Sequence, residues 1–561
     1  MTDATVAPEA HVPLSHREIL VVFSGLMAGM LLAALDQTIV STALPTIVGE
    51  LGGQERLAWV VTAYLLSSTV STPLWGKISD LYGRKRLYQI AIVVFVVGSM
   101  LIGLSQNLTM LVAFRAVQGL GAGGLMALSQ AIIGDIVSPR ERGRYQGYMG
   151  SVFAFSSVAG PLLGGFFVDN LSWRWCFYIN LPVGIVALVI TSAVLRVDFR
   201  RTQHTIDYAG AALLVAAVSP LLLMLEWGGR EYEWGSSTIL GLGVFGLAML
   251  ALFIAQERRA SEPILPLRLF RNDVFTVSTM ASLVVGLAMF GAIIFLPQYL
   301  QIVRGKSPTV SGLYMLPMMV GMMTTMIATG RLIARTGRYR KYPIMGLMVL
   351  PVGLWLLSML KTDSSFVQMG LSMFVVGVGI GLVMQVLVLA TQNAVEHQDL
   401  GVATSAVTFF RSMGGAVGVA VFGAIMSNRL EFHIPRLLPE GAKAQLSGGS
   451  GGDLSSLLGS PEQIRNLPPA IMEAITEGFA RSLHVVFLVA IPAALIGLVI
   501  VLFLREQQLR TTTHMGTAAA MGEDAGVAFE FAIAPDGSVP DLTEADAPNP
   551  PSSRRGAPAG S

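Results

Sequence analysis

Long apolar runs alternate with short polar segments along most of this chain. A helix needs about 20 apolar residues to cross a bilayer, and a helix satisfies its own backbone polar groups in lipid. The pattern therefore predicts an all-α integral membrane protein with about fourteen transmembrane helices. They are expected near residues 19–44, 57–75, 87–105, 109–134, 146–168, 176–195, 208–226, 236–256, 274–299, 309–333, 343–360, 366–390, 401–426 and 482–504.

The first run is too long for a signal-peptide core, which spans roughly 7–15 residues. We therefore expect an uncleaved first span after a polar N-terminal tail, residues 1–18. A long external loop is expected at 427–480, with a Gly/Ser stretch and an amphipathic segment near 468–479. Whether this loop meets a periplasmic partner stays open. The tail at 505–561 is rich in Ala, Gly, Pro and Asp and is expected to be disordered and cytoplasmic.

Basic residues cluster in alternate loops, and the short loops between them hold two at most. The clusters are Lys77/Arg84/Lys85/Arg86, Arg140/Arg142/Arg144, Arg196/Arg200/Arg201, Arg258/Arg259/Arg268/Arg271 and Arg331/Arg335/Arg338/Arg340/Lys341. Since lysine and arginine are enriched on the cytoplasmic side, both termini are predicted to be cytoplasmic, which requires an even number of spans. The excess of arginine over lysine points to a bacterial genome, and hence to a bacterial plasma (inner) membrane.

Composition agrees with a lipid-facing surface. Hydrophobic residues make up 53% of the chain and charged residues 13%, against roughly 25% charged in soluble proteins. The bilayer is thus the expected partner, and a net charge of +2 gives no field for nucleic acid. With one cysteine, Cys176, and seven histidines confined to tails, loops and span ends, neither a metal site nor another cofactor is expected.

Two motifs are decoys. The G-x-G-x-x-G match at 119–124 lies within an apolar span rather than after a strand, so it does not indicate a dinucleotide site. Gly305-Lys306-Ser307 lacks the glycine that a phosphate-binding loop needs five residues earlier, where Leu300 stands. No sign of ATP hydrolysis or of an in-membrane catalytic set remains, and the chain is not expected to be an enzyme.

An internal repeat joins the two ends of the chain. Gly76, Gly83, Arg84 and Arg86 recur after a shift of 254 residues (330 − 76 = 254) as Gly330, Gly337, Arg338 and Arg340. The same shift carries the Gly160-x-x-x-Gly164 pair onto Gly414-x-x-x-Gly418. Two six-helix pseudo-symmetric halves are predicted, at 19–200 and 273–504, with two inserted helices and a linker at 201–272. Such parallel halves with a substrate site between them are one plan of secondary transporters.

At this point the chain resembles the major facilitator superfamily, in its fourteen-span drug/proton antiporter branch. The resemblance covers roughly residues 18–505. It rests on the Gly76–Arg86 loop, Leu35–Pro45, Arg115–Gly119, Gly160–Gly165 and Trp173–Asn180. In the second half Ala334 stands where the first half has Asp80, so any charge clamp there should be weaker.

Asp36 is the one carboxylate well inside a predicted span, and ionisable groups at such depth are usually functional. Arg115 lies about 9 Å and Asp36 about 12 Å from the outer ends of their spans, at 1.5 Å per residue, so the two can share a depth. Burial favours a protonated Asp36 and Arg115 favours the carboxylate. Proton coupling at Asp36 is the leading hypothesis, and a static ion pair between spans is the alternative.

The other candidate residues follow largely from the resemblance. It implies a cytoplasmic conformational clamp of Gly76, Asp80, Gly83, Arg84, Asp135 and Arg142; the alternative is that the basic residues set topology only. It also implies an antiport motif at Gly160, Pro161, Gly164 and Gly165, where a packing seam is the alternative. Met315, Met318, Met319, Met322, Met323 and Met326 in the tenth span fit a ligand surface or, more simply, a lipid-facing one. Substrate-cavity candidates are Gln37, Gln118, Gln298, Tyr299, Gln301, Gln385 and Arg411.

These features predict a proton-coupled antiporter that exports lipophilic, drug-like small molecules, cations included, by alternating access. An exporter of a dedicated endogenous metabolite, lipid or siderophore would use the same fold and is the alternative. A membrane enzyme or passive channel explains neither Asp36 nor the repeat.

Overall fold

The described part of the chain is helical. The computed structural model describes residues 16–51, 57–195, 207–229, 231–438 and 468–509, and no β-strand occurs among them. The helices of the first half and the central pair are α1 (His16–Leu51), α2 (Leu57–Tyr82), α3 (Arg84–Gly103), α4 (Leu108–Ile136), α5 (Pro139–Asn170), α6 (Trp175–Tyr178), α7 (Asn180–Val194), α8 (Tyr208–Trp227) and α9 (Ser237–Glu257).

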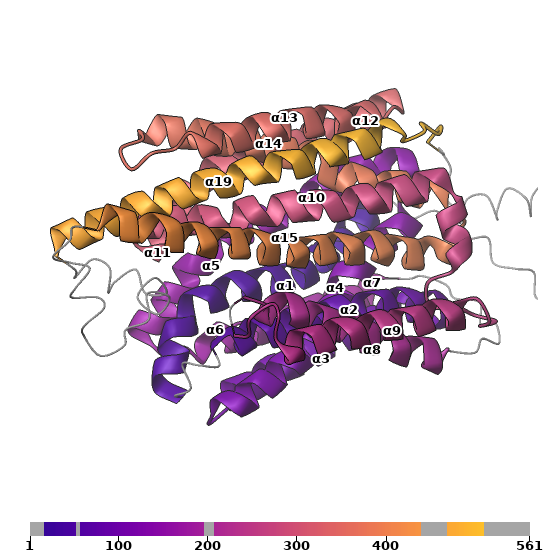
Figure 1. The fold of residues 1–561 in the computed structure, drawn as a ribbon. Helices are drawn as coiled ribbons and strands as arrows, with labels where there is room; N and C mark the ends of the chain where they lie inside the picture. Colours follow the sequence, from indigo (N-terminus) through magenta and orange to yellow (C-terminus); the bar gives the residue numbers. More distant parts are fainter. Residues whose placement is uncertain (1–15, 52–56, 196–206, 230, 439–467, 510–561) are drawn as a thin grey trace, which may run out of the picture. The chain divides into compact units, whose positions relative to one another are not determined.

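The second half follows a short 3₁₀ turn, η2 (Leu267–Arg271). Its elements are α10 (Asp273–Gln298), η3 (Tyr299–Val303), α11 (Pro308–Tyr314), α12 (Leu316–Thr336), α13 (Lys341–Ser358), α14 (Phe366–Ala394), η4 (His397–Asp399), α15 (Leu400–Leu437) and α19 (Pro469–Leu502). The long helices run side by side (Figure 1).

Local sequence sets several helix boundaries. Asn107, Ser236 and Ser365 each accept a hydrogen bond from a backbone N–H in the first turn of the helix that follows, which satisfies one of the free donors there. Gly83 (φ 93°) separates α2 from α3, and its repeat partner Gly337 (φ 70°) separates α12 from α13. Both backbones lie in the left-handed region that glycine enters at no steric cost.

Twelve helices among the described residues are long and apolar enough to cross a bilayer. They match twelve of the fourteen predicted spans. The other two predictions correspond to α2 and α5, which have 26 and 32 residues and pack inside the same bundle, but carry more polar positions. The all-helical membrane fold is therefore confirmed, and fourteen crossings stay a prediction that this bundle accommodates.

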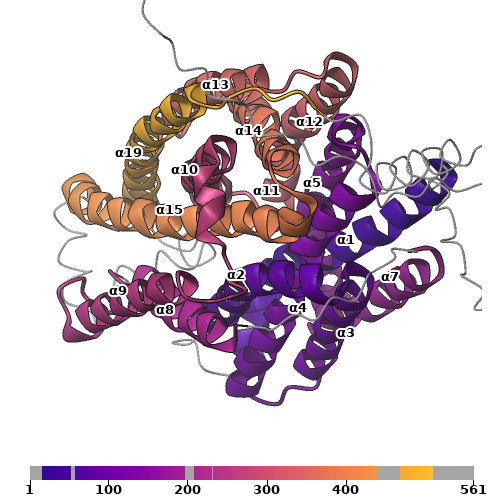
Figure 2. The same cartoon turned by 90° about the vertical axis from the view of Figure 1, so that its right-hand side faces the viewer.

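The two halves repeat the same helix contacts. In the first, α1 packs on α5 and α7, while α4 packs on α2 and α3. In the second, α10 packs on α15 and α19, while α14 packs on α12 and α13. Between the halves, α2 contacts α15 and α5 contacts α12, which are again repeat-related pairs (Figure 2). The predicted pseudo-symmetry is confirmed, with α8 and α9 as an inserted helix pair that contacts α2 and α15.

The repeated glycines mark one of these contacts. A methyl group on Gly160 of α5 would overlap Thr38 of α1, and one on Gly414 of α15 would overlap the Leu283 carbonyl of α10. Small residues let helix backbones approach closely. The same glycine spacing in both halves therefore produces the same close pair of helices, α1 with α5 and α10 with α15.

Some predicted boundaries differ from the structure. The tenth span is interrupted at Met315, between α11 and α12, and the sixth consists of α6 and α7. The predicted loop at 427–480 is too long, because α15 continues to Leu437 and α19 begins at Pro469. The remainder of that loop, most of both tails and Arg196, Arg200 and Arg201 lie outside the described residues.

A labelling experiment tests whether α2 crosses the bilayer. In a Cys176→Ser background we expect Gln106→Cys, exposed between α3 and α4, to react with a membrane-impermeant maleimide applied to intact cells. Arg86→Cys, exposed at the start of α3, should react only after the cells are permeabilised. With the N-terminus cytoplasmic, as predicted, the opposite pattern would mean that α2 does not cross the membrane.

Candidate functional site

An ion pair is buried at the centre of the first half. Asp36 of α1 is 0% exposed and Arg115 of α4 is 2% exposed. Arg115 Nη1 lies 2.5 Å from Asp36 Oδ2, and Arg115 Nε donates to the Val60 carbonyl oxygen of α2 at 3.1 Å. The predicted common depth of the two residues is confirmed. The pair joins three helices, so a change in its charge state acts on all three.

Amide side chains complete the shell around the carboxylate. Gln118 Nε2 donates to Asp36 Oδ1 at 2.8 Å, and Asn180 Nδ2 of α7 donates to the same oxygen at 3.2 Å. Both amides also donate to Ser99 Oγ of α3, at 2.6 and 3.1 Å. Asp36 thus accepts hydrogen bonds from three residues, and each of them stabilises its charged form.

Arg115 also lies close to two aromatic rings. Its guanidinium carbon lies 4.2 Å from the ring centroid of Tyr64 and 6.0 Å from that of Phe177. A cation over an aromatic face is stabilised by the ring's electron distribution. The arginine therefore has favourable contacts that do not involve Asp36.

A second charged cluster lies at the basic end of the bundle, which we define as the end that carries Arg84, Arg142, Arg335 and Arg505. Arg84 Nη2 lies 2.9 Å from Asp80 Oδ1, and Arg84 Nε pairs with Asp135 at the end of α4. Arg142 donates to the Val137 carbonyl at 2.8 Å and also to the Gly134 carbonyl. The structure therefore brings together all four charged residues proposed for the clamp within the first half.

Asp80 also reaches the other half. Its carboxylate oxygens accept from the backbone N–H groups of Gly401 and Val402, at 3.2 and 2.9 Å, in the first turn of α15. A helix N-terminus favours a negative charge, so this contact holds the halves together. Gly76 permits the approach, because a methyl group there would overlap Ser405 of α15.

The repeat-related contact uses different chemistry. Ala334 has no charged side chain. Instead, Arg140 of α5 donates from Nε to the Ala334 carbonyl at 2.9 Å and from Nη2 to the Arg335 carbonyl at 3.1 Å. A cation at a helix C-terminus is again favourable. The halves are thus joined at the basic end by an anion on the start of α15 and by a cation on the end of α12.

Buried amides add a third contact between the halves. Gln392 of α14 donates from Nε2 to the Gln130 carbonyl of α4 at 3.0 Å and to Thr404 Oγ1 of α15 at 3.2 Å. Gln146 of α5 donates to Gln392 Oε1 at 3.4 Å. These contacts also lie toward the basic end, and the structure is closed there.

The glycine and proline motif of α5 packs against α1. Pro161 lies inside the helix, where it removes one backbone hydrogen bond and favours a bend. Gly160 and Gly164 are buried, whereas Pro161 and Gly165 are partly exposed. Thr38 Oγ1 donates to the Ser156 carbonyl one turn earlier, at 2.9 Å. The motif is therefore a close α1–α5 contact within half a turn of Asp36.

The substrate-cavity candidates do not form one cluster. Gln118 is part of the shell around Asp36, and the Tyr299 hydroxyl donates to the Lys361 carbonyl at 2.6 Å, near the end opposite the basic one. Gln37 and Gln298 are exposed and Gln301 is partly exposed. Gln385 and Arg411 are buried and, among the described residues, have no hydrogen-bond partner.

The methionines of α12 are mostly buried, so the prediction that they face lipid was wrong for Met318, Met319, Met322 and Met326.

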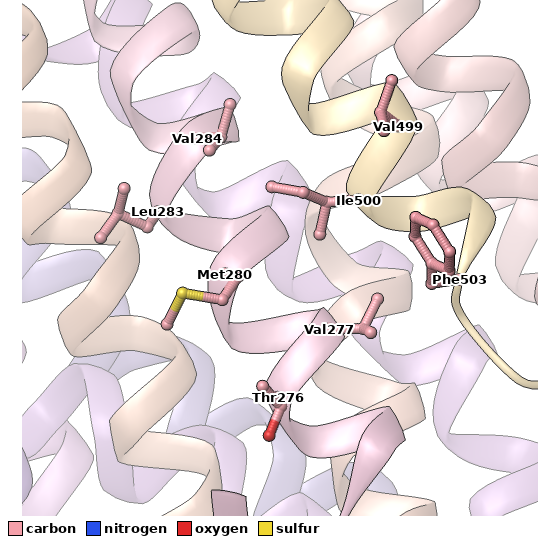
Figure 3. Close-up of a pocket in the computed structure, with 8 residues that line it drawn as sticks. All are labelled: Thr276, Val277, Met280, Leu283, Val284, Val499, Ile500 and Phe503. Atoms are coloured by element: carbon pink, nitrogen blue, oxygen red, sulfur yellow. The ribbon is translucent and has the colours of Figure 1, made fainter.

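An apolar groove of about 310 Å³ lies between α10 and α19 (Figure 3). It is lined by Thr276, Val277, Met280, Leu283, Val284, Val499, Ile500 and Phe503. Val499 and Phe503 are 55% and 70% exposed, which places the groove on the outer surface of the second half. Its lining offers no charge and is built from other helices than the Asp36 site.

Trp173 and Arg174 serve the opposite end of the first half. Trp173 Nε1 donates to Glu50 at 2.9 Å, and Arg174 lies 2.7 Å from the same carboxylate. The hydrogen bond from Arg174 lowers the pKa of Glu50. These residues tie the end of α1 to the start of the sixth span and so help to place Asn180 beside Asp36.

Known proteins resemble most of the chain. A family model described as Major Facilitator Superfamily matches residues 26–419. An uncharacterized MFS-type transporter of Mycobacterium tuberculosis is 43% identical over 507 residues, which cover 90% of this chain and 72% of that protein. The multidrug transporter protein MdtP of Bacillus subtilis is 39% identical, with 88% of this chain and 94% of that protein covered.

Solved structures show the same fold. The proton:xylose symporter XylE superposes with a TM-score of 0.59 at 14% identity, covering 90% of this chain and all of that one.

The buried pair predicts an asymmetric effect on stability. Arg115→Leu leaves Asp36 buried without its cation, which should cost about 3 kcal/mol or more. The double variant Asp36→Asn/Arg115→Leu removes the unpaired charge and should regain part of that loss. The measurement is the fraction of detergent-solubilised protein that stays monodisperse after heating. Equal melting temperatures for the single and double variants would contradict a charge-driven cost.

Proposed function

Because this chain belongs to the Major Facilitator Superfamily, we propose that it is a proton-coupled antiporter that exports lipophilic, drug-like small molecules by alternating access. The family and fold are those of transporters rather than of enzymes. The single observation that supports the proposal most is the Asp36 site: a carboxylate that is fully buried among hydrogen-bond donors at the centre of one half.

Proton coupling needs a group whose charge can change inside the membrane. Asp36 is the buried carboxylate at that depth, and its charged form depends on donors from α4 and α7. Any motion that separates these helices removes donors and favours the protonated form. Protonation then weakens the link between α1 and α4, and so couples proton uptake to helix movement.

Alternating access needs two closures that exclude each other. The structure is closed at the basic end through the Asp80, Arg140 and Gln392 contacts. By the positive-inside rule this end is cytoplasmic, and we place the chain in a bacterial inner membrane with both termini inside. The cargo would enter from the cytoplasm once these contacts break and leave at the other side. Cations are included among the expected cargoes, and the name of MdtP supports a drug-like cargo.

Efflux from cells tests the function. Cells that express the wild type should export preloaded ethidium, and a protonophore should stop this export. Asp36→Asn, which cannot change charge, should lower the efflux rate at least about tenfold. Asp273→Asn, on the exposed pair with Arg505, is the control and should leave efflux intact.

Two results would count against the proposal. Export of ethidium against its gradient by Asp36→Asn would remove this residue from coupling. Absence of efflux in well-expressed wild type would favour a dedicated cargo.

A second experiment tests the closure at the basic end. Asp80→Asn removes the charge that holds both Arg84 and the start of α15, so the end should open more often. A reporter cysteine at Leu389, 1% exposed in this structure, should then react several-fold faster with a maleimide applied to inside-out vesicles of a Cys176→Ser background.

Glu262→Gln is the control, since it likewise removes an acid that forms an ion pair at this end, the one with Lys77. It should leave the labelling rate unchanged. An equal rate in Asp80→Asn would show that the carboxylate does not hold the closed state.

A further inference from the structure

Arg411 is a buried cation without a counter-charge. It lies in α15 with 8% of its surface exposed. Among the described residues, neither a carboxylate nor any other hydrogen-bond acceptor lies within bonding distance of its guanidinium group. A charge inside a membrane span is costly unless it pairs or lines a polar cavity. An arginine in this position therefore needs a partner that the described protein does not supply.

Gln385 of α14 is also a buried polar side chain without a hydrogen-bond partner among the described residues. It is 5% exposed, and both its amide nitrogen and its amide oxygen lack a hydrogen-bond partner. Buried amides are normally bonded, and an unbonded one costs free energy. Two such groups on consecutive helices call for a common explanation.

The register of α14 and α15 places the two side chains at one level. The helices are antiparallel neighbours that contact each other, and the Gln392–Thr404 hydrogen bond of 3.2 Å fixes their relative position. Gln385 lies seven residues before Gln392, and Arg411 lies seven residues after Thr404. Seven residues are nearly two helical turns and about 10 Å. Gln385 thus lies on nearly the same face of α14 as Gln392, and Arg411 on nearly the same face of α15 as Thr404. Both lie about 10 Å farther from the basic end.

The space beside Gln385 is closed in this state. Gln385 and Gln146 line a cavity of about 10 Å³ between α5, α12 and α14, close to the smallest volume that holds one water molecule. Gln146, which lines the cavity, also donates to Gln392 in the contact between the halves. A larger ligand therefore needs this contact to break before it can reach Gln385, as loading from the cytoplasm requires.

We propose that Arg411 and Gln385 bind an anionic acceptor group, a carboxylate foremost, on the exported compound. This inference rests on the export function proposed above. Guanidinium donors match a carboxylate in geometry and charge, and the amide of Gln385 offers a further donor at the same level on the neighbouring helix α14. The site lies in the second half, whereas the proton site at Asp36 lies in the first. The cargo range therefore includes lipophilic anions and zwitterions as well as cations.

A pair of related dyes separates this site from general transport. Fluorescein carries a free carboxylate, whereas rhodamine 6G is a cation whose carboxylate is esterified. In energised inside-out vesicles the wild type should accumulate both dyes. Arg411→Gln should lower fluorescein uptake about tenfold or more, the usual scale for losing one partner of a buried charge pair, while rhodamine 6G uptake stays within about twofold. Arg411→Lys should restore part of the fluorescein uptake, and the exposed Arg271→Gln is the control.

Binding to purified protein keeps the test decisive. Fluorescein anisotropy should rise with wild type and with Arg271→Gln, and should rise far less with Arg411→Gln or Gln385→Leu. The anion site would be overturned if Arg411→Gln lowered the uptake of both dyes equally, or left both unchanged. It would also be overturned if fluorescein bound equally well to the wild type and to Arg411→Gln. Failure of the wild type to transport either dye would instead contradict the proposed drug export, and the binding result would still decide the anion site.

Discussion

The structure of the first half depends on one buried charge pair. A carboxylate inside a membrane protein is stable only if its surroundings replace the water it has lost. Here α1 supplies Asp36, α4 supplies Arg115 and Gln118, and α7 supplies Asn180. The cost of the buried charge therefore fixes the relative positions of these helices. The same dependence makes the site sensitive to helix position, because a shift of α4 or α7 removes one or more of the carboxylate's hydrogen-bond donors.

The contacts between the halves differ in kind from this pair. At the basic end they are pairs of hydrogen bonds between one side chain and a helix terminus, as for Asp80 with the start of α15 and Arg140 with the end of α12. Such contacts contribute about 0.3–1 kcal/mol each near a surface, so the closure is strong only as a set. A conformational cycle needs this property, since the contacts must form and break in every turnover while each half keeps its own core.

Much of this arrangement could be predicted from the sequence. Apolar runs located the helices, the shift of 254 residues located the pseudo-symmetry, and residue counting placed Asp36 and Arg115 at one depth. The roles of Ser99 and Asn180 were missed, although Asn180 stood in a recognised motif, because helix rotation decides which polar residue faces the carboxylate. Gln146 and Gln392 are 246 residues apart and meet only through the packing of the halves. No local pattern signals such a contact.

The helix ends were missed for a different reason. The last turns of α15 contain Glu431, His433 and Arg436, and a count of apolar residues stops before them although the helix continues. Arg140 was seen only as one of a basic cluster, because its acceptors are backbone carbonyls of the other half, which a sequence does not mark. Ala334, which stands where the first half has Asp80, could have indicated the role of Arg140. The repeat implied a contact between the halves at Ala334, and that contact needed a charge from another residue.

Proton movement in reconstituted vesicles tests the central claim most directly. Purified protein in liposomes with a trapped pH-sensitive dye would receive an imposed gradient of ethidium, with no other driving force. Proton counterflow in the opposite direction to ethidium is predicted for the wild type, and none for Asp36→Asn even where ethidium still moves down its gradient. Ethidium flux without proton counterflow in the wild type, or undiminished counterflow in Asp36→Asn, would contradict proton-coupled export through Asp36.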